Sequence, residues 1–129
     1  AIMNMYRGIL DELKYGDEYN VINAGYGDNS PGVKAFFQNY HTQRAKKRIK
    51  VKMLANADTR GKLVPSTLVK SSVRYLPEYV KENMMVLFYK DKVFMFFLTE
   101  EPRGFLMVGK DVVSGFKTYF DALWGVSKE

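Results

Sequence analysis

The sequence predicts one α/β domain with a mixed parallel and antiparallel sheet and helices on its faces. Two early segments follow a strand–helix order, which is typical of parallel neighbouring strands. Two later runs rich in Val, Phe and Tyr are separated by a short polar link, which indicates an antiparallel hairpin. The chain has 129 residues, of which 47% are apolar, so one domain can bury a sizeable core.

The first half of the chain alternates between helix and strand patterns. Apolar residues three and four positions apart indicate a helix face, whereas alternation indicates a strand. Gly16 and the stretch 25–32, which is rich in Gly, Asp and Asn, separate these patterns. Ser30 is expected to cap a helix that Pro31 opens. The expected elements are a helix over 2–14, a strand over 19–24, a helix over 31–47 and a strand over 49–54.

The second half contains most of the expected strands. Residues 55–71 show the weakest periodicity, and Asp91 is expected in the turn of the hairpin. The expected strands cover 72–76, 84–89, 93–99 and 103–108. A last helix begins near Asp111 and should bury one face against the sheet. The residues expected on that face are Val112, Phe116, Tyr119, Phe120, Leu123 and Trp124.

The net charge of +6 is concentrated in one part of the chain. Segment 43–52 is rich in Lys and Arg and contains no acidic residue. We interpret it as a solvated helix end, whose charges complement the helix dipole, followed by a strand with outward lysines. The alternative is a surface for a phosphate backbone. No aromatic residue lies within the run to stack on bases, which favours the first interpretation.

Residues typical of catalysis or metal binding are scarce. The chain has no cysteine, and His41 is its only histidine. No sequence pattern supplies His41 with a catalytic partner, so we expect a surface or boundary residue. A metal site would need several ligands at close spacing. No apolar run is long enough to span a bilayer. We expect a soluble, cytoplasmic protein that is not an enzyme, needs no cofactor and does not contact a membrane.

Polar and glycine-rich loops follow the first two expected strands. Ligands of open α/β sheets bind beyond the carboxyl ends of parallel strands. Glycines let the backbone approach a ligand, and amide and carboxylate groups match sugar hydroxyls. The alternative is that both loops are ordinary turns. The candidate ligand-binding residues are Gly25, Tyr26, Gly27, Asp28, Asn29, Ser30, Asn56 and Asp58.

Five segments carry a family resemblance, in order along nearly the whole chain: 36–41, 47–54, 73–77, 89–93 and 115–124. The most distinctive piece is Tyr-Phe-x-x-Leu-Trp at 119–124. Together they resemble the C-terminal effector domain of TrmB-like archaeal transcription regulators. The resemblance implies a phospholipase D-like fold and a position after a winged helix-turn-helix that binds DNA.

The resemblance also implies that the domain senses a small molecule, such as a sugar, or mediates dimerisation. The phospholipase D pattern His-x-Lys is absent, because Gln43 stands two positions after His41. We therefore expect residues 1–129 to be a single non-catalytic effector domain that forms a homodimer. DNA binding is expected only through a helix-turn-helix that these residues do not contain. The alternative is a degenerate phospholipase D-like nuclease or phosphodiesterase that binds nucleic acid.

Overall fold

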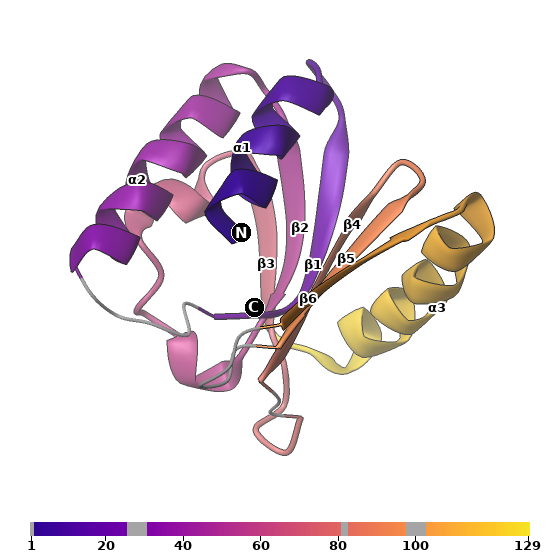
Figure 1. Cartoon of the computed structure of the whole chain (residues 1–129). Helices are drawn as coiled ribbons and strands as arrows, with labels where there is room; N and C mark the ends of the chain where they lie inside the picture. The colour runs from indigo at the N-terminus through magenta and orange to yellow at the C-terminus, as the bar shows by residue number, and fades with distance from the viewer. Residues whose placement is uncertain (1, 26–30, 81–82, 98–102) are drawn as a thin grey trace.

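The structure is a computed structural model that describes residues 2–25, 31–80, 83–97 and 103–129. Its centre is a six-stranded sheet in the order β3-β2-β1-β4-β5-β6, with helices on both faces (Figure 1). In the described segments, no helix combines the length and apolar character that crossing a membrane requires. The elements are α1 (Ile2–Glu12), β1 (Glu18–Ala24), α2 (Pro31–Lys46), β2 (Lys50–Ala55), η1 (Ala57–Thr59), η2 (Pro65–Leu68), β3 (Ser71–Tyr75), β4 (Met84–Tyr89), β5 (Lys92–Phe97), β6 (Arg103–Val108) and α3 (Lys110–Val126).

The sheet is mixed, as the sequence predicts. Strands β1, β2 and β3 run parallel, whereas β4 pairs antiparallel with β1 and continues into β5 and β6. The expected hairpin is confirmed, with Lys90 and Asp91 in its turn. Lys90 has φ 51°, the left-handed conformation that a two-residue turn of this kind requires. Because the turn is this short, β5 begins at Lys92 rather than Val93, and residues 98 and 99 lie outside the described part.

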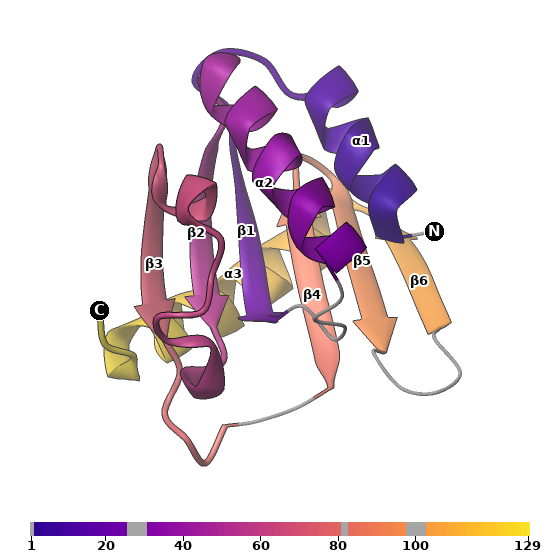
Figure 2. The ribbon, with the colours of Figure 1, turned by 90° about the vertical axis from the view of Figure 1, so that its left-hand side faces the viewer.

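Helices α1 and α2 cover one face of the sheet, and α3 crosses the other face toward β3 (Figure 2). Alternate residues of each strand therefore enter different cores. Tyr19, Val21 and Val51 face α1 and α2, whereas Ile22 and Leu54 belong to the core beneath α3. The N-terminal cap predicted at Ser30 lies outside the described residues.

The last helix buries less of its surface than the sequence predicts. Phe120 is fully buried, but Phe116 and Trp124 are half-buried and Tyr119 is 68% exposed. The prediction for Tyr119 was wrong because α3 lies alone on its face of the sheet. A single helix on a sheet buries a narrow stripe, and Tyr119 lies about 100° around the helix from Phe120.

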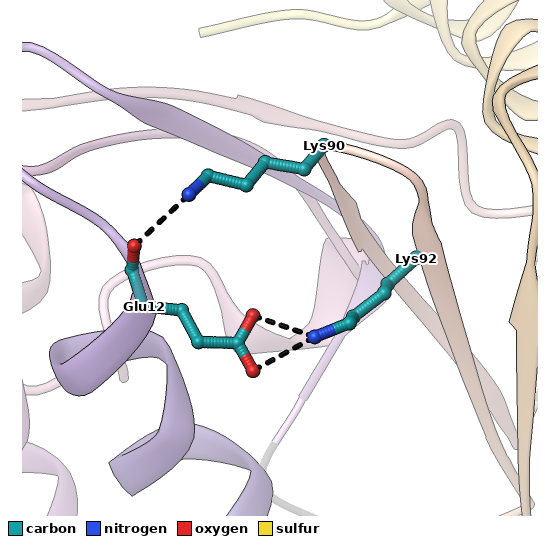
Figure 3. A network of polar contacts seen from close by, with 3 residues as sticks. All are labelled: Glu12, Lys90 and Lys92. Atoms are coloured by element: carbon teal, nitrogen blue, oxygen red, sulfur yellow. Dashed lines mark hydrogen bonds and ion pairs between the residues drawn. The ribbon is translucent and has the colours of Figure 1, made fainter.

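A polar network joins the end of α1 to the β4–β5 turn (Figure 3). Lys92 Nζ donates to both carboxylate oxygens of Glu12, at 2.8 and 2.9 Å. Lys90 Nζ donates to the backbone oxygen of Glu12 at 3.1 Å. The hydrogen bond from Lys92 lowers the pKa of Glu12. Helix α1 is thereby fixed over the antiparallel half of the sheet.

Candidate functional site

The ends of β1 and β2 lie side by side, so the two predicted ligand loops leave the sheet next to each other. The backbone N–H of Asn56 donates to the oxygen of Ala24 at 3.0 Å. A Cβ added to Gly25 would lie 3.1 Å from Asn56 Nδ2, so the glycine permits a close approach. Parallel pairing thus brings Gly25 and Asn56 together at the edge where the sequence analysis places a ligand.

Asn23, which the sequence analysis missed, distorts this end of β1. Its φ of 60° is uncommon for a residue other than glycine, and the register shifts between Ile22 and Ala24. The side-chain oxygens of Asn23 and Asn56 are buried and have no hydrogen-bond partner among the described residues. Buried polar atoms nearly always have a hydrogen-bond partner. Within the described residues, the strand ends therefore hold two buried acceptors that lack a donor.

The cavity beside Gly25 is too small for a sugar. It has a volume of about 20 Å³ and is lined mainly by apolar side chains, together with His41 and Thr67. A cavity of this size holds about one water molecule. Asp58 is exposed in η1. The remaining candidates, Tyr26, Gly27, Asp28, Asn29 and Ser30, lie outside the described residues, so the ligand role of this loop pair stays a prediction.

The structure overturns the predicted surface or boundary location of His41. Its side chain is buried, with 3% of the residue exposed, and Nδ1 accepts a hydrogen bond from Arg44 Nε at 3.0 Å. Burial, and secondarily the charge of Arg44, lower the pKa of His41 to about 3. The imidazole is therefore neutral at ordinary pH, and its Nδ1 is occupied.

Arg44 is likewise buried, although the basic run was predicted to be a solvated helix end. Its guanidinium has five N–H groups, and each points to an acceptor. One acceptor is His41, and the other four are backbone oxygens, at 2.7–3.4 Å. The four backbone acceptors belong to Ile49, Thr67, Val69 and Lys70.

A sequence signal for this buried cluster was present. Positions 37, 40, 41 and 44 are spaced as one helix face, and all four are buried. Because arginine is charged, Arg44 was instead predicted to be exposed together with the lysines of the basic run. The predicted solvent exposure of the basic run is confirmed for Lys46, Lys47, Arg48 and Lys50. Lys52 is half-buried, because α3 covers its face of the strand.

The β6 edge of the sheet exposes apolar side chains on both faces. Leu106 pairs with Phe94 on the α1–α2 face, and Phe105 pairs with Met95 on the α3 face. Phe105 and Leu106 are each 53% exposed, and Val108 is 62% exposed. The pairing of β6 with β5 is regular over its whole length, without a bulge. β6 is the last strand of the sheet, so one of its sides has no neighbouring strand among the described residues.

Comparison with known proteins supports the fold. No protein-family model matches the sequence, and no curated protein matches it. A solved structure of TrmBL2, an archaeal chromatin protein described with a novel mode of DNA binding, superposes with a TM-score of 0.68 at 16% sequence identity. The match covers 98% of this chain and 49% of that chain, so this chain spans about half the length of TrmBL2. At this identity, the chain shares its mixed α/β fold with part of a TrmB-like archaeal protein.

Proposed function

We propose that this chain is the non-catalytic regulatory domain of a TrmB-like transcription regulator, with a phospholipase D-like fold, and that it dimerises through β6. The observation that carries the proposal is the exposed apolar edge strand, with Phe105, Leu106 and Val108 open to solvent. The likeness to half of TrmBL2 supports the assignment to this class of protein.

A second copy of the same strand is the occupant that fits this edge. Soluble proteins protect exposed edges with charged residues, prolines or bulges, and within the described residues 103–108 Arg103, at the start of the strand, is the one such feature. Two identical strands can pair antiparallel about a twofold axis, because such an interface is self-complementary. Because β6 presents apolar side chains on both faces, a strand that pairs with it needs apolar side chains on both faces to cover them. A second copy of β6 meets this requirement.

The environment of His41 supports the absence of phosphodiesterase activity. A nucleophilic or acid–base histidine must reach the substrate and exchange a proton near neutral pH. His41 is buried, neutral and bonded through Nδ1 to Arg44. His41→Gln should therefore leave any trace hydrolysis of a generic phosphodiester unchanged, and a large loss of rate in this variant would contradict the proposal.

Sedimentation analysis tests the dimer. The unmodified chain should sediment as a dimer, and the double variant Leu106→Lys/Val108→Lys should sediment as a monomer. The matched control is Leu68→Lys/Val126→Lys, whose residues are 57% exposed each but lie away from β6. A monomeric unmodified chain, or dimers that survive the β6 substitutions, would contradict the proposal.

A sugar-like effector at the ends of β1 and β2, outside the small cavity beside Gly25, is the second part of the proposal. The side-chain oxygens of Asn23 and Asn56 favour it, because they are buried and have no hydrogen-bond partner among the described residues. A screen of sugars by thermal shift should find a stabilising ligand, because a ligand that binds the folded state raises apparent stability. Asn56→Ala should abolish that shift while the fold remains intact, and an unchanged shift would exclude the site.

A further inference from the structure

A groove of about 560 Å³ opens at the opposite side of the sheet from β6, between β3 and the C-terminal turns of α3. Its lining includes Lys52 of β2, Ser72 and Arg74 of β3, and Trp124 of α3. In the register of β2 and β3, Lys52 pairs with Ser72 and Leu54 with Arg74. These side chains therefore share the face of the sheet on which α3 lies.

Two cations converge on one aromatic ring in this groove. Lys52 Nζ lies 4.4 Å from the centre of a Trp124 ring, and the guanidinium carbon of Arg74 lies 4.6 Å from it. The negative face of the indole attracts both cations and restrains them. Arg74 also donates from Nη1 to the backbone oxygen of Trp124 at 2.8 Å. Both positive charges thus lie against the side chain of Trp124 at one groove.

These charges lack an acidic partner within the described part of the chain. The ion pairs found there involve other lysines, and Arg74 makes one hydrogen bond, so further N–H groups of its guanidinium are available. Glu129 also lines the groove, and its backbone oxygen accepts a hydrogen bond from Arg60. An anion between Lys52 and Arg74 would relieve their mutual repulsion and form charge-assisted hydrogen bonds to both.

We propose that this groove binds a small phosphorylated ligand, whose phosphoryl group lies between Lys52 and Arg74. A guanidinium offers paired donors that match a phosphate, and an ammonium adds a point charge. The exposed hydroxyl of Ser72 adds a further donor beside Lys52. The groove volume falls within the roughly 300–1,000 Å³ of small-molecule sites, which leaves room for a sugar or nucleoside beside the phosphate.

The geometry favours a small ligand over a nucleic acid. A duplex presents phosphates along a line, and proteins meet it with basic groups spread over several contacts. Here the two cations meet at a single ring, and Glu129 adds an acidic side chain to the same groove. The proposal does not depend on the proposed dimer, because β6 forms the other edge of the sheet.

The chain contains its own reporter, since Trp124 is its only tryptophan. We suggest titrating the full chain with inorganic phosphate and with glucose 6-phosphate while following tryptophan emission at constant ionic strength. Both probes should give a saturable change, whereas glucose and added chloride should give none. Isothermal titration calorimetry provides an affinity that does not depend on how the substitutions alter the emission.

Substitutions identify the groove. Lys52→Gln and Arg74→Gln should each weaken glucose 6-phosphate binding by about tenfold, the loss typical of one charge-assisted hydrogen bond. Using both variants guards against one that fails to fold. Lys34→Gln, on exposed α2 surface across the sheet, removes the same charge and should bind as the unmodified chain does. Glu129→Gln should strengthen binding severalfold, because it removes a competing carboxylate.

Four results would overturn the proposal. The first is no saturable response to either phosphate probe. The second is equal binding by the Lys52 and Arg74 variants and the unmodified chain. The third is a response to a short DNA duplex, lost in Lys52→Gln, without any response to glucose 6-phosphate; this result would identify a nucleic-acid surface instead. Equal responses to glucose and glucose 6-phosphate would also exclude phosphate recognition.

Discussion

The two edge strands of the sheet differ in how their free sides are treated. At β3, Tyr75 exchanges backbone hydrogen bonds with Lys128, at 2.6 and 3.0 Å, and the guanidinium of Arg60 lies 4.2 Å from the Tyr75 ring centre. At β6, in the described chain, Leu106 and Val108 remain exposed on a strand with regular pairing only to β5. The chain therefore protects part of its β3 edge with its own C-terminal residues. The bare β6 edge is suited to another chain.

The β3 side is also fixed from within, by Arg44. This side chain donates to backbone oxygens just before β2 and just before β3, at Ile49 and at Val69 and Lys70. No equivalent buried cation lies beneath β6 in the described residues. The β3 side is thus held in place by internal hydrogen bonds, whereas the β6 side exposes apolar side chains in the described residues.

The largest effect is expected at Arg44. Arg44→Lys keeps the charge but loses the planar fork, which leaves buried carbonyls without donors, so the free energy of unfolding should fall by about 3 kcal/mol or more. Arg48→Lys is the matched control, since Arg48 is exposed, and it should change stability by less than about 0.5 kcal/mol. Chemical denaturation measures both variants, and equal losses would show that Arg44 does not anchor the β3 side.

A smaller effect concerns pH. The pKa of His41 is about 3 in the folded chain and near 6.5 when unfolded, so the unfolded chain binds one more proton between these values. Stability from this residue is complete above pH 6.5 and is lost progressively as the pH falls toward 3. Between pH 7 and 5 the loss should be about 1–2 kcal/mol.

The control for this pH effect is His41→Gln. The variant keeps a polar side chain but cannot titrate, so its stability should depend less on pH over the same window. Urea denaturation at both pH values gives the comparison. Parallel losses in the two proteins would assign the pH dependence to carboxylates and not to His41.

The smallest effect is expected for DNA binding by the exposed basic residues at the end of α2. We expect weak binding at low salt, because no aromatic side chain lies within the basic run 43–52 to stack on bases. A triple variant should flatten the salt dependence of this binding: Lys46→Gln, Lys47→Gln and Arg48→Gln together. Each phosphate contact contributes about −0.9 to the slope of the logarithm of the binding constant against the logarithm of the salt concentration. Tight, strongly salt-sensitive binding by the unmodified chain would make the charged side of the molecule a nucleic-acid surface.

Periodicity predicted most of the fold, because most helices and strands in this chain carry a clear apolar pattern of their own period. The boundaries of β4 and β6 match their expected ranges, and the hairpin turn contains Asp91 as predicted. The exposure of Tyr119 was not predictable from its helix alone, because the width of the buried stripe depends on what else covers that face. Periodicity identifies the apolar face of a helix, whereas the extent to which that face is buried depends on the elements that pack against it.

The candidate site was less predictable, because its features arise from contacts between distant segments. Parallel pairing of β1 and β2 was expected, and it places Gly25 beside Asn56. Nothing local in the sequence indicates that Arg44 meets carbonyl groups more than twenty residues away, at Thr67 and Val69. The convergence of Lys52 and Arg74 on Trp124 likewise depends on where α3 ends over the sheet.

The absence of cysteine allows a direct test of the contrast between the two edges. Single cysteines placed in turn at positions 104 to 108 should form disulfide-linked dimers under mild oxidation, because paired edges bring symmetric positions within the roughly 4.4–6.8 Å between Cα atoms that a disulfide requires. Leu68→Cys, comparably exposed but located beside β3, should form no disulfide-linked dimer under the same conditions. Rapid linkage that peaks at one β6 position and is absent at Leu68 is the predicted result. Failure at every β6 position, or equal linkage at Leu68, would contradict dimerisation through β6.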